Sequence, residues 1–146
     1  QSLPLRIKFS IRFTGEDSNA PITFFLQNQG YTALQINQFL LNDHLLHLKL
    51  TRKDKSLTAD GCFSGRPIIG VTPSYTITPG EVIEFEMRVL WSNKLEMFMN
   101  GVKWLGVSGM GTFQRATEYI FGFTSSHTGT QTLTNAHITS VKYCIG

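Results

Sequence analysis

Between Glu81 and Trp104 the sequence reads EVIEFEMRVLW, SN, KLEMFM, NG and VKW, so that runs of alternating apolar and polar residues are separated by short turn sequences. Period-two alternation is typical of β-strands that bury one face. The Asn100-Gly101 pair is the strongest of the turn signals, because both residues tolerate positive φ. The segment predicts a β-meander with strands over Val82–Trp91, Lys94–Asn100 and a third short run from Val102.

The first of these strands has one apolar and one charged face. The apolar face carries Ile83, Phe85, Met87 and Val89, and the charged face carries Glu84, Glu86 and Arg88. We expect the charged face to meet solvent or a second layer of polar groups. Its two glutamates could also be the carboxylate pair of a sandwich glycosidase, since retaining enzymes hold their carboxyls only ~5 Å apart. Because Arg88 can neutralise them, we favour a structural role.

The composition indicates one folded domain. The 146 residues suffice for a two-layer core, and we expect a single domain over residues 1–146. With 41% hydrophobic and 16% charged residues, disorder is not expected. The 11 phenylalanines favour strands.

The charge pattern does not favour nucleic acid as a partner. The net charge is +3, and the basic cluster of Lys49, Arg52, Lys53 and Lys55 is interrupted by Asp54, so we interpret it as a solvated loop. No apolar run approaches the roughly 20 residues of a membrane-spanning helix. The chain begins at Gln1 rather than Met, which is typical of a processed chain or an excised domain.

Cysteines and histidines predict neither a metal site nor a cofactor. Cys62 and Cys144 are too few for a disulfide scaffold, and a single bridge or two free buried thiols remain alternatives. The four histidines, without ligand spacing, are interpreted as surface or strand residues; they are His44, His47, His127 and His137.

Short strands continue along the rest of the chain. They are predicted at Leu5–Phe13, Ile22–Gln27, Thr32–Leu40, Leu45–Arg52, Glu118–Phe123 and His137–Ile145. Leucines within Tyr31–Leu50 also fall at helical spacings, but the missing helix cap favours two strands there. We expect Thr51–Thr72 to be a long polar connection with at most a short edge strand at Ile68-Ile69, and the glycines of Leu105–Gly111 to form turns. The pattern predicts an all-β fold, a sandwich of two antiparallel sheets.

The run from Thr76 to Trp91, continued through Leu95–Gly101, resembles the galectin pattern of a glycine turn, an alternating strand, a short turn and a second strand ending in Asn-Gly. The segments Leu5–Gly15, Ile22–Gln27 and Ile138–Cys144 also resemble the ends of galectins. The resemblance covers nearly the whole chain and is one of spacing more than of identity. It implies a galectin-like jelly roll, no enzyme activity, and β-galactoside binding on the concave sheet.

The galectin sugar motif can be carried over only in part. Its His-x-Asn-x-Arg element would fall on Gln35-Ile-Asn37-Gln-Phe39, where Asn37 matches and Gln35 keeps hydrogen-bonding groups. Phe39, however, cannot replace an arginine. The asparagine of the following strand would fall near Lys49.

The tryptophan and glutamate of the galectin pattern should lie within Cys62–Val71, where this sequence has Phe63 and Arg66 instead. Recognition of galactose needs an aromatic face and planar groups for the hydroxyls. Most of this set is absent, which argues against ordinary lactose binding and leaves a rebuilt glycan site as one alternative. The candidate ligand-binding residues are Gln35, Asn37, His47, Lys49, Phe63 and Arg66.

Two functions follow from the sequence. The first is a lectin domain that binds a glycan or glycoprotein on its concave sheet. The alternative is a galectin-like fold that has lost galactoside binding and serves protein–protein interaction, with Gln35 and Asn37 as the polar side of a half-exposed strand. An aromatic residue at Phe39 or Phe63 that lines an open polar groove would suit a sugar, whereas an apolar patch would suit a protein partner. The resemblance also suggests an extracellular or secreted protein.

Overall fold

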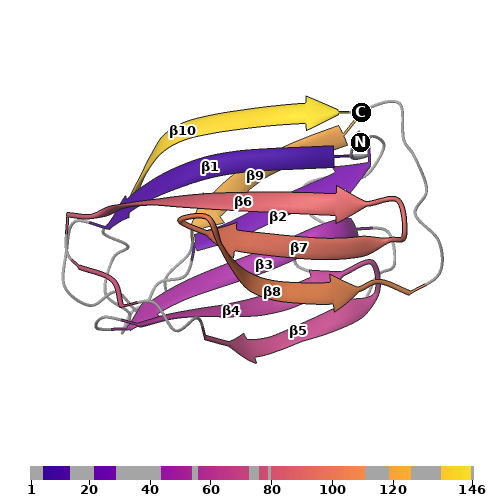
Figure 1. The fold of residues 1–146 in the computed structure, drawn as a ribbon, viewed down its shortest axis with the longest axis horizontal. Helices are drawn as coiled ribbons and strands as arrows, with labels where there is room; N and C mark the ends of the chain where they lie inside the picture. The colour runs from indigo at the N-terminus through magenta and orange to yellow at the C-terminus, as the bar shows by residue number, and fades with distance from the viewer. Residues whose placement is uncertain are drawn as a thin grey trace.

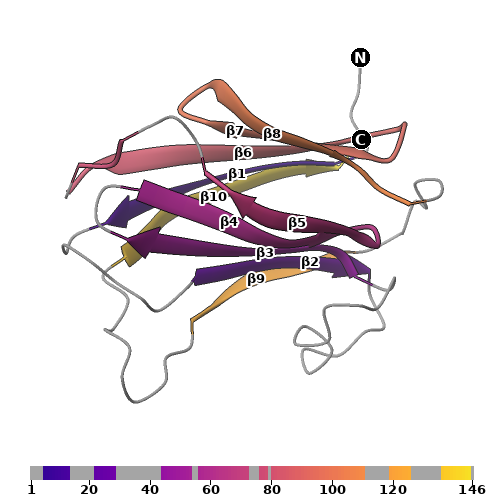
Figure 2. The same cartoon turned by 90° about the horizontal axis from the view of Figure 1, so that it is seen from below.

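The computed structural model describes residues 5–13, 22–28, 44–53, 56–72, 76–78, 80–110, 119–125 and 136–145. These residues form two antiparallel five-stranded sheets, which face each other as two layers (Figures 1 and 2). The strands are β1 (Leu5–Phe13), β2 (Ile22–Asn28), β3 (His44–Lys53), β4 (Ser56–Phe63), β5 (Arg66–Val71), β6 (Val82–Leu90), β7 (Lys94–Met99), β8 (Val102–Ser108), β9 (Tyr119–Ser125) and β10 (Ala136–Ile145). The predicted all-β sandwich is confirmed.

The first sheet has the order β10-β1-β6-β7-β8 and the second the order β5-β4-β3-β2-β9. Pairing of Leu5 with Ile145 places the start of β1 beside the end of β10. The strands predicted near both ends of the chain are confirmed, whereas the predicted strand Thr32–Leu40 lies outside the described residues.

The central meander is confirmed as β6, β7 and β8. Its two turns contain Asn93, Asn100 and Gly101, whose φ angles are 58°, 49° and 80°. The third strand is longer than predicted, because β8 pairs with β7 through Gly106 as far as Ser108. The interpretation of Gly106 as a turn residue was therefore wrong: pairing with β7 outweighs the weak strand preference of glycine.

The expected long connection between residues 51 and 72 instead contains the hairpin of β4 and β5, and the edge strand expected at Ile68-Ile69 is confirmed as part of β5. Strand β4 buries Leu57, Ala59 and Phe63 while its intervening polar residues face away from the core. Gly61 lets β4 approach β3, since a Cβ at this position would lie 1.8 Å from the carbonyl oxygen of His47. Glycine and polar residues thus serve strand pairing here, which is why the sequence looked like a loop.

Three residues of the basic cluster lie in a strand and not in a solvated loop. Lys49, Arg52 and Lys53 belong to β3. Arg52 is buried, and its guanidinium lies 5.6 Å from the centre of the Phe13 ring. A cation over an aromatic face explains how this charge is tolerated between the sheets.

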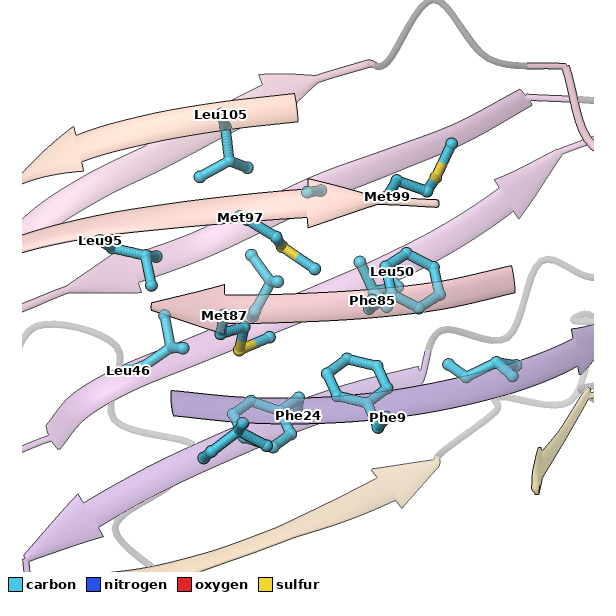
Figure 3. Close-up of a cluster of buried hydrophobic side chains, with 14 of the residues drawn as sticks. Phe9, Phe24, Leu46, Leu50, Phe85, Met87, Leu95, Met97, Met99 and Leu105 are labelled. Carbon is cyan, nitrogen blue, oxygen red and sulfur yellow. The ribbon is translucent and has the colours of Figure 1, made fainter. Parts of the chain in front are cut away.

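The core lies between the two sheets and is rich in aromatic rings (Figure 3). Phe9 is fully buried, and its ring stacks on Phe24 from the opposite sheet and on Phe85 from the neighbouring strand. Phe123 meets the Phe9 ring edge-on, with centroids 5.1 Å apart. Offset and edge-on pairs are the favoured aromatic geometries, so this cluster joins both layers.

The two sheets are also joined by polar contacts near the β4–β5 turn. The buried Asn93 side chain donates to the Ser64 hydroxyl and to the Met110 carbonyl, both at 3.1 Å. The Met110 amide donates to the Ser64 carbonyl at 2.8 Å. Arg66 adds a bond from its Nε to the Ser108 carbonyl at 3.3 Å.

Candidate ligand-binding faces

The outer face of the second sheet, here called the β3 face, is built by alternation along β2, β3 and β4. Residues that flank buried leucines of β3 must point away from the core. Their cross-strand partners point the same way. The β3 face carries Thr23, Phe25, His47, Lys49, Thr51, Thr58, Asp60, Cys62 and Pro67.

A polar row crosses the middle of the β3 face. Lys49 lies between Thr23 of β2 and Asp60 of β4. The Asp60 carboxylate accepts a 2.7 Å hydrogen bond from the Gly70 amide, which fixes the bulge of β5. No carboxylate in the described part of the chain forms an ion pair with Lys49.

A more closely packed row lies next to it. Phe25 stands between His47 and Gly122, and its ring covers Gly122, where an added Cβ would lie 2.9 Å away. Phe25 is 9% and His47 only 5% exposed. These two rings therefore form the floor of the face rather than projecting from it.

Cys62 lies opposite His47 and is a free thiol. Burial raises the pKa of Cys62, and a backbone hydrogen bond from Gly65 opposes this only in part. Of the two alternatives left open by the sequence, the structure supports a free thiol at Cys62.

The structure brings together only part of the candidate residue set. His47 and Lys49 lie two residues apart on the β3 face, whereas Gln35 and Asn37, as well as Phe39, are outside the described residues. Phe63 is fully buried in the core, and its aromatic face is not available to a sugar.

Arg66 is exposed at the start of β5 and reaches Ser108 of β8, away from the β3 face. Sequence reasoning missed Thr23, Phe25, Thr51 and Asp60. Alternation within β2 and β3 could have placed the first three, but Asp60 lay in the segment that was not expected to be a strand.

The outer face of the first sheet, here called the β1 face, is organised around Glu86. Both Nε and Nη2 of Arg6 donate to its carboxylate at 3.2 Å, Arg88 donates a further hydrogen bond, and the Lys8 ammonium lies 3.5 Å away. Burial raises the pKa of Glu86, but the hydrogen bonds and charges of Arg88 and Arg6 outweigh burial and hold it below the usual range. A carboxylate held in its ionised form by three cations is poorly suited to act as a general acid.

The described residues show neither a metal site nor a membrane-spanning helix. They contain no group of three or more histidines, cysteines or acidic residues placed to hold a metal ion. Nor do they include a helix long and apolar enough to cross a membrane.

Comparison with known proteins shows a fold shared with lectins. No protein-family model matches the sequence, and no curated protein sequence does. Sheep galectin-11 in complex with glycerol is 11% identical, with a TM-score of 0.58 over 99% of this chain and 92% of the galectin. The carbohydrate recognition domain of Emp47p is 10% identical, with a TM-score of 0.64 over 100% of this chain and 73% of that domain.

The same architecture also occurs in an enzyme. An alginate lyase of polysaccharide lyase family 7, AlgAT5, is 9% identical, with a TM-score of 0.60 over 97% of this chain and 59% of the lyase. At these identities the similarities establish the fold alone. The chain has a galectin-like β-sandwich fold, as the sequence pattern predicted.

Proposed function

We propose that this protein is a non-catalytic recognition domain that binds a glycan on the β3 face. The observation that carries the proposal is the polar row formed by Thr23, Lys49 and Asp60 on an otherwise packed sheet. Hydroxyl, ammonium and carboxylate groups can bond the hydroxyls of a sugar. The similarity of fold to galectins and to a carbohydrate recognition domain supports this choice.

Strand β3 provides a second location for the galectin-like element that was assigned to Gln35–Phe39. His47, Lys49 and Thr51 lie at alternate positions on one face, which repeats the spacing of His-x-Asn-x-Arg. Because Lys49 and Thr51 replace asparagine and arginine, we expect the preferred sugar to differ from a simple β-galactoside.

The alternative function is protein–protein interaction through the edge strand β5. Ile69 is 80% exposed, and Pro67 beside Cys62 is exposed as well. Apolar side chains at an open sheet edge suit a protein partner better than a sugar. An extracellular location is proposed for either function and rests on the resemblance to galectins.

A screen of neutral glycans with the purified protein tests the lectin proposal. We expect selective binding that is lost in Lys49→Ala and weakened in Thr51→Val, which removes a hydroxyl with little change of shape. Ser140→Ala on the exposed outer side of β10 is the control and should bind normally. A Gln35→Ala/Asn37→Ala variant tests the location predicted from sequence.

No binding by a correctly folded protein, or equal binding by wild type and Lys49→Ala, would overturn the β3-face proposal. Loss of binding only in Gln35→Ala/Asn37→Ala would move the site to that segment. Activity on alginate should be assayed in parallel, and cleavage would contradict a non-catalytic role.

A further inference from the structure

The β1 face concentrates the positive charge of the protein. Its described basic side chains are Arg6, Lys8, Arg12, Arg88, Lys94, Lys103 and Lys142, against the acidic side chains Glu84, Glu86 and Glu96. This single face therefore holds seven of the 13 basic residues but three of the 10 acidic ones. Its excess of four positive charges is larger than the net charge of +3 of the whole chain.

Two cross-strand pairs on this face have like charges. Lys8 of β1 is directly opposite Lys142 of β10, and Arg6 is directly opposite Arg88 of β6. Like charges in directly opposed positions destabilise a sheet. Glu86 relieves the second pair by bonding both arginines.

The Lys8–Lys142 pair has less compensation. Lys8 lies at the edge of the Glu86 cluster, 3.5 Å from the carboxylate, which already accepts bonds from two arginines. Lys142 is exposed, and among the described residues no carboxylate pairs with it. An anion from outside the chain would complete this arrangement.

The surface is hollowed at the same place. Arg6, Lys8, Lys142 and Tyr143 line a shallow hollow of about 180 Å³. One water molecule takes up ~30 Å³ in the liquid, so the hollow can admit a group of several heavy atoms. Tyr143, at the side of β10, lines the hollow as well and is 62% exposed.

We propose that the hollow of Arg6, Lys8, Lys142 and Tyr143 binds a sulfate group of an acidic oligosaccharide, whose further sulfates lie along the basic β1 face. This is a second glycan site, on the opposite side of the sandwich from the β3 face. It does not depend on the function proposed for the β3 face.

The surroundings favour a sulfated sugar over other polyanions. Single-stranded nucleic acid needs open aromatic faces for its bases. The Phe98 ring of this face, however, is covered by Arg88 at 4.3 Å, and the ring of Tyr143, which pairs with the buried Ile7, meets Phe121 of the other sheet at 5.4 Å. An acidic peptide that binds by strand addition would pair with the edge strand β10, whereas most cations of the β1 face lie on β1, β6 and β7 inside the sheet. A flexible sulfated chain needs only spaced cations on an open surface.

Binding of a heparin-type sulfated hexasaccharide to the full chain, measured by calorimetry or fluorescence anisotropy, tests the proposal. The desulfated hexasaccharide, a single-stranded oligonucleotide and an oligoglutamate of equal charge are the comparison ligands. We expect only the sulfated sugar to bind well, and its binding to weaken between 0.05 and 0.15 M salt because screening increases.

Charge-matched variants test the location. Lys142→Gln should weaken binding about threefold and Lys8→Gln/Lys142→Gln about tenfold, as expected for exposed ion pairs. Arg66→Gln removes the same charge at the start of β5, where Arg66 bonds the Ser108 carbonyl of β8. It should leave binding of the sulfated sugar unchanged. Binding of neutral glycans should be unchanged in Lys142→Gln, which separates this site from the β3 face.

Three results would overturn the proposal. The first is an absence of binding to the sulfated hexasaccharide. The second is an equal loss in Arg66→Gln and Lys142→Gln, which would indicate a general effect of net charge. The third is equal or tighter binding of the oligonucleotide or the oligoglutamate, which would assign the face to that partner instead.

Discussion

The ring of Phe9 in β1 stacks on the ring of Phe24 in β2, with centroids 5.4 Å apart and ring planes 11° from parallel. The two strands belong to different sheets, so this pair spans the interior of the sandwich. Both side chains are fully buried, Phe85 also stacks on Phe9, and Phe123 meets the Phe9 ring edge-on. The position of one sheet relative to the other therefore depends on the contact between the Phe9 ring of the first sheet and the Phe24 ring of the second.

Replacing Phe9 by alanine should lower the free energy of unfolding by ~3–5 kcal/mol, because it opens a cavity between the sheets. Phe98→Ala is the matched control, since Phe98 lies on the outer face and contacts the Arg88 guanidinium. Its loss should cost about 1 kcal/mol. Urea unfolding measures both, and equal costs would show that the aromatic cluster does not dominate the core.

Replacing Glu86 by glutamine should destabilise the fold at neutral pH by ~1–2 kcal/mol. The substitution removes the charge that Arg6, Arg88 and Lys8 share, while the partly exposed cations regain some hydration. Lys103→Gln breaks the more exposed bond of Lys103 to Glu96 and should cost less than 1 kcal/mol. A larger loss in the control would contradict the central role of Glu86.

The contribution of Glu86 should depend on pH in a defined direction. Its pKa in the folded protein is lowered, so its stabilising effect is complete above the unfolded value of about 4.3. The effect is lost as the pH falls below this value and through the lower pKa of the folded state. Unfolding measured from pH 7 to pH 3 should show the gap between wild type and Glu86→Gln closing at the acidic end. A gap that is constant over the whole range would refute the assignment.

Gly61→Ala should destabilise the β3–β4 pair by at least ~2 kcal/mol or prevent folding. The new Cβ would lie 1.8 Å from the His47 carbonyl oxygen, and backbone on both strands would have to move. Gly106→Ala in β8 is the control, since its Cβ would meet only the flexible Lys103 and Lys94 side chains at 3.4 to 3.5 Å. Thermal unfolding should rank the two variants clearly, and similar melting temperatures would argue against this close approach of the strands.

Asn93→Gly should lower the free energy of unfolding by ~1–2 kcal/mol, because glycine keeps the positive φ but cannot form the side-chain hydrogen bonds to Ser64 and Met110. Asn100→Gly is the comparison, as Asn100 is exposed and its side chain accepts one bond, from the Glu84 amide. We expect Asn100→Gly to lower the free energy of unfolding by less than Asn93→Gly does. If the two variants are equally stable, the polar junction at Asn93 does not hold the sheets together.

Much of the strand pattern could be predicted from local sequence. The alternation in Leu5–Phe13 and Val82–Leu90 reports directly which side chains are buried, since neighbouring residues of a strand point to opposite faces. The same alternation, interrupted by turn residues that tolerate positive φ, located the meander turns at Asn93 and Asn100. It failed at β4 and β5, where bulges, glycine and outward polar residues hide the alternation.

The positions of the candidate site residues were harder to predict from the sequence. Sequence placed Phe63 and Arg66 with a sugar site, yet Phe63 completes the core and Arg66 reaches Ser108. It also grouped Lys49 and Arg52 in one loop, although Lys49 belongs to the outer face of β3 and Arg52 is buried against Phe13. Strand direction and register had to be known before these residues could be separated.

Sequence alone was thus sufficient for the all-β class, the central meander and the galectin-like pattern, because these depend on period-two burial and on turn residues that are neighbours in the chain. Tertiary structure was needed to bring Lys8 opposite Lys142 and to surround Glu86 with Arg6, Lys8 and Arg88. Those residues come from β1, β6 and β10, and only cross-strand pairing sets the distances between them. Electrostatic interactions depend on such distances, so the charge of a face cannot be deduced from the order of residues along the chain.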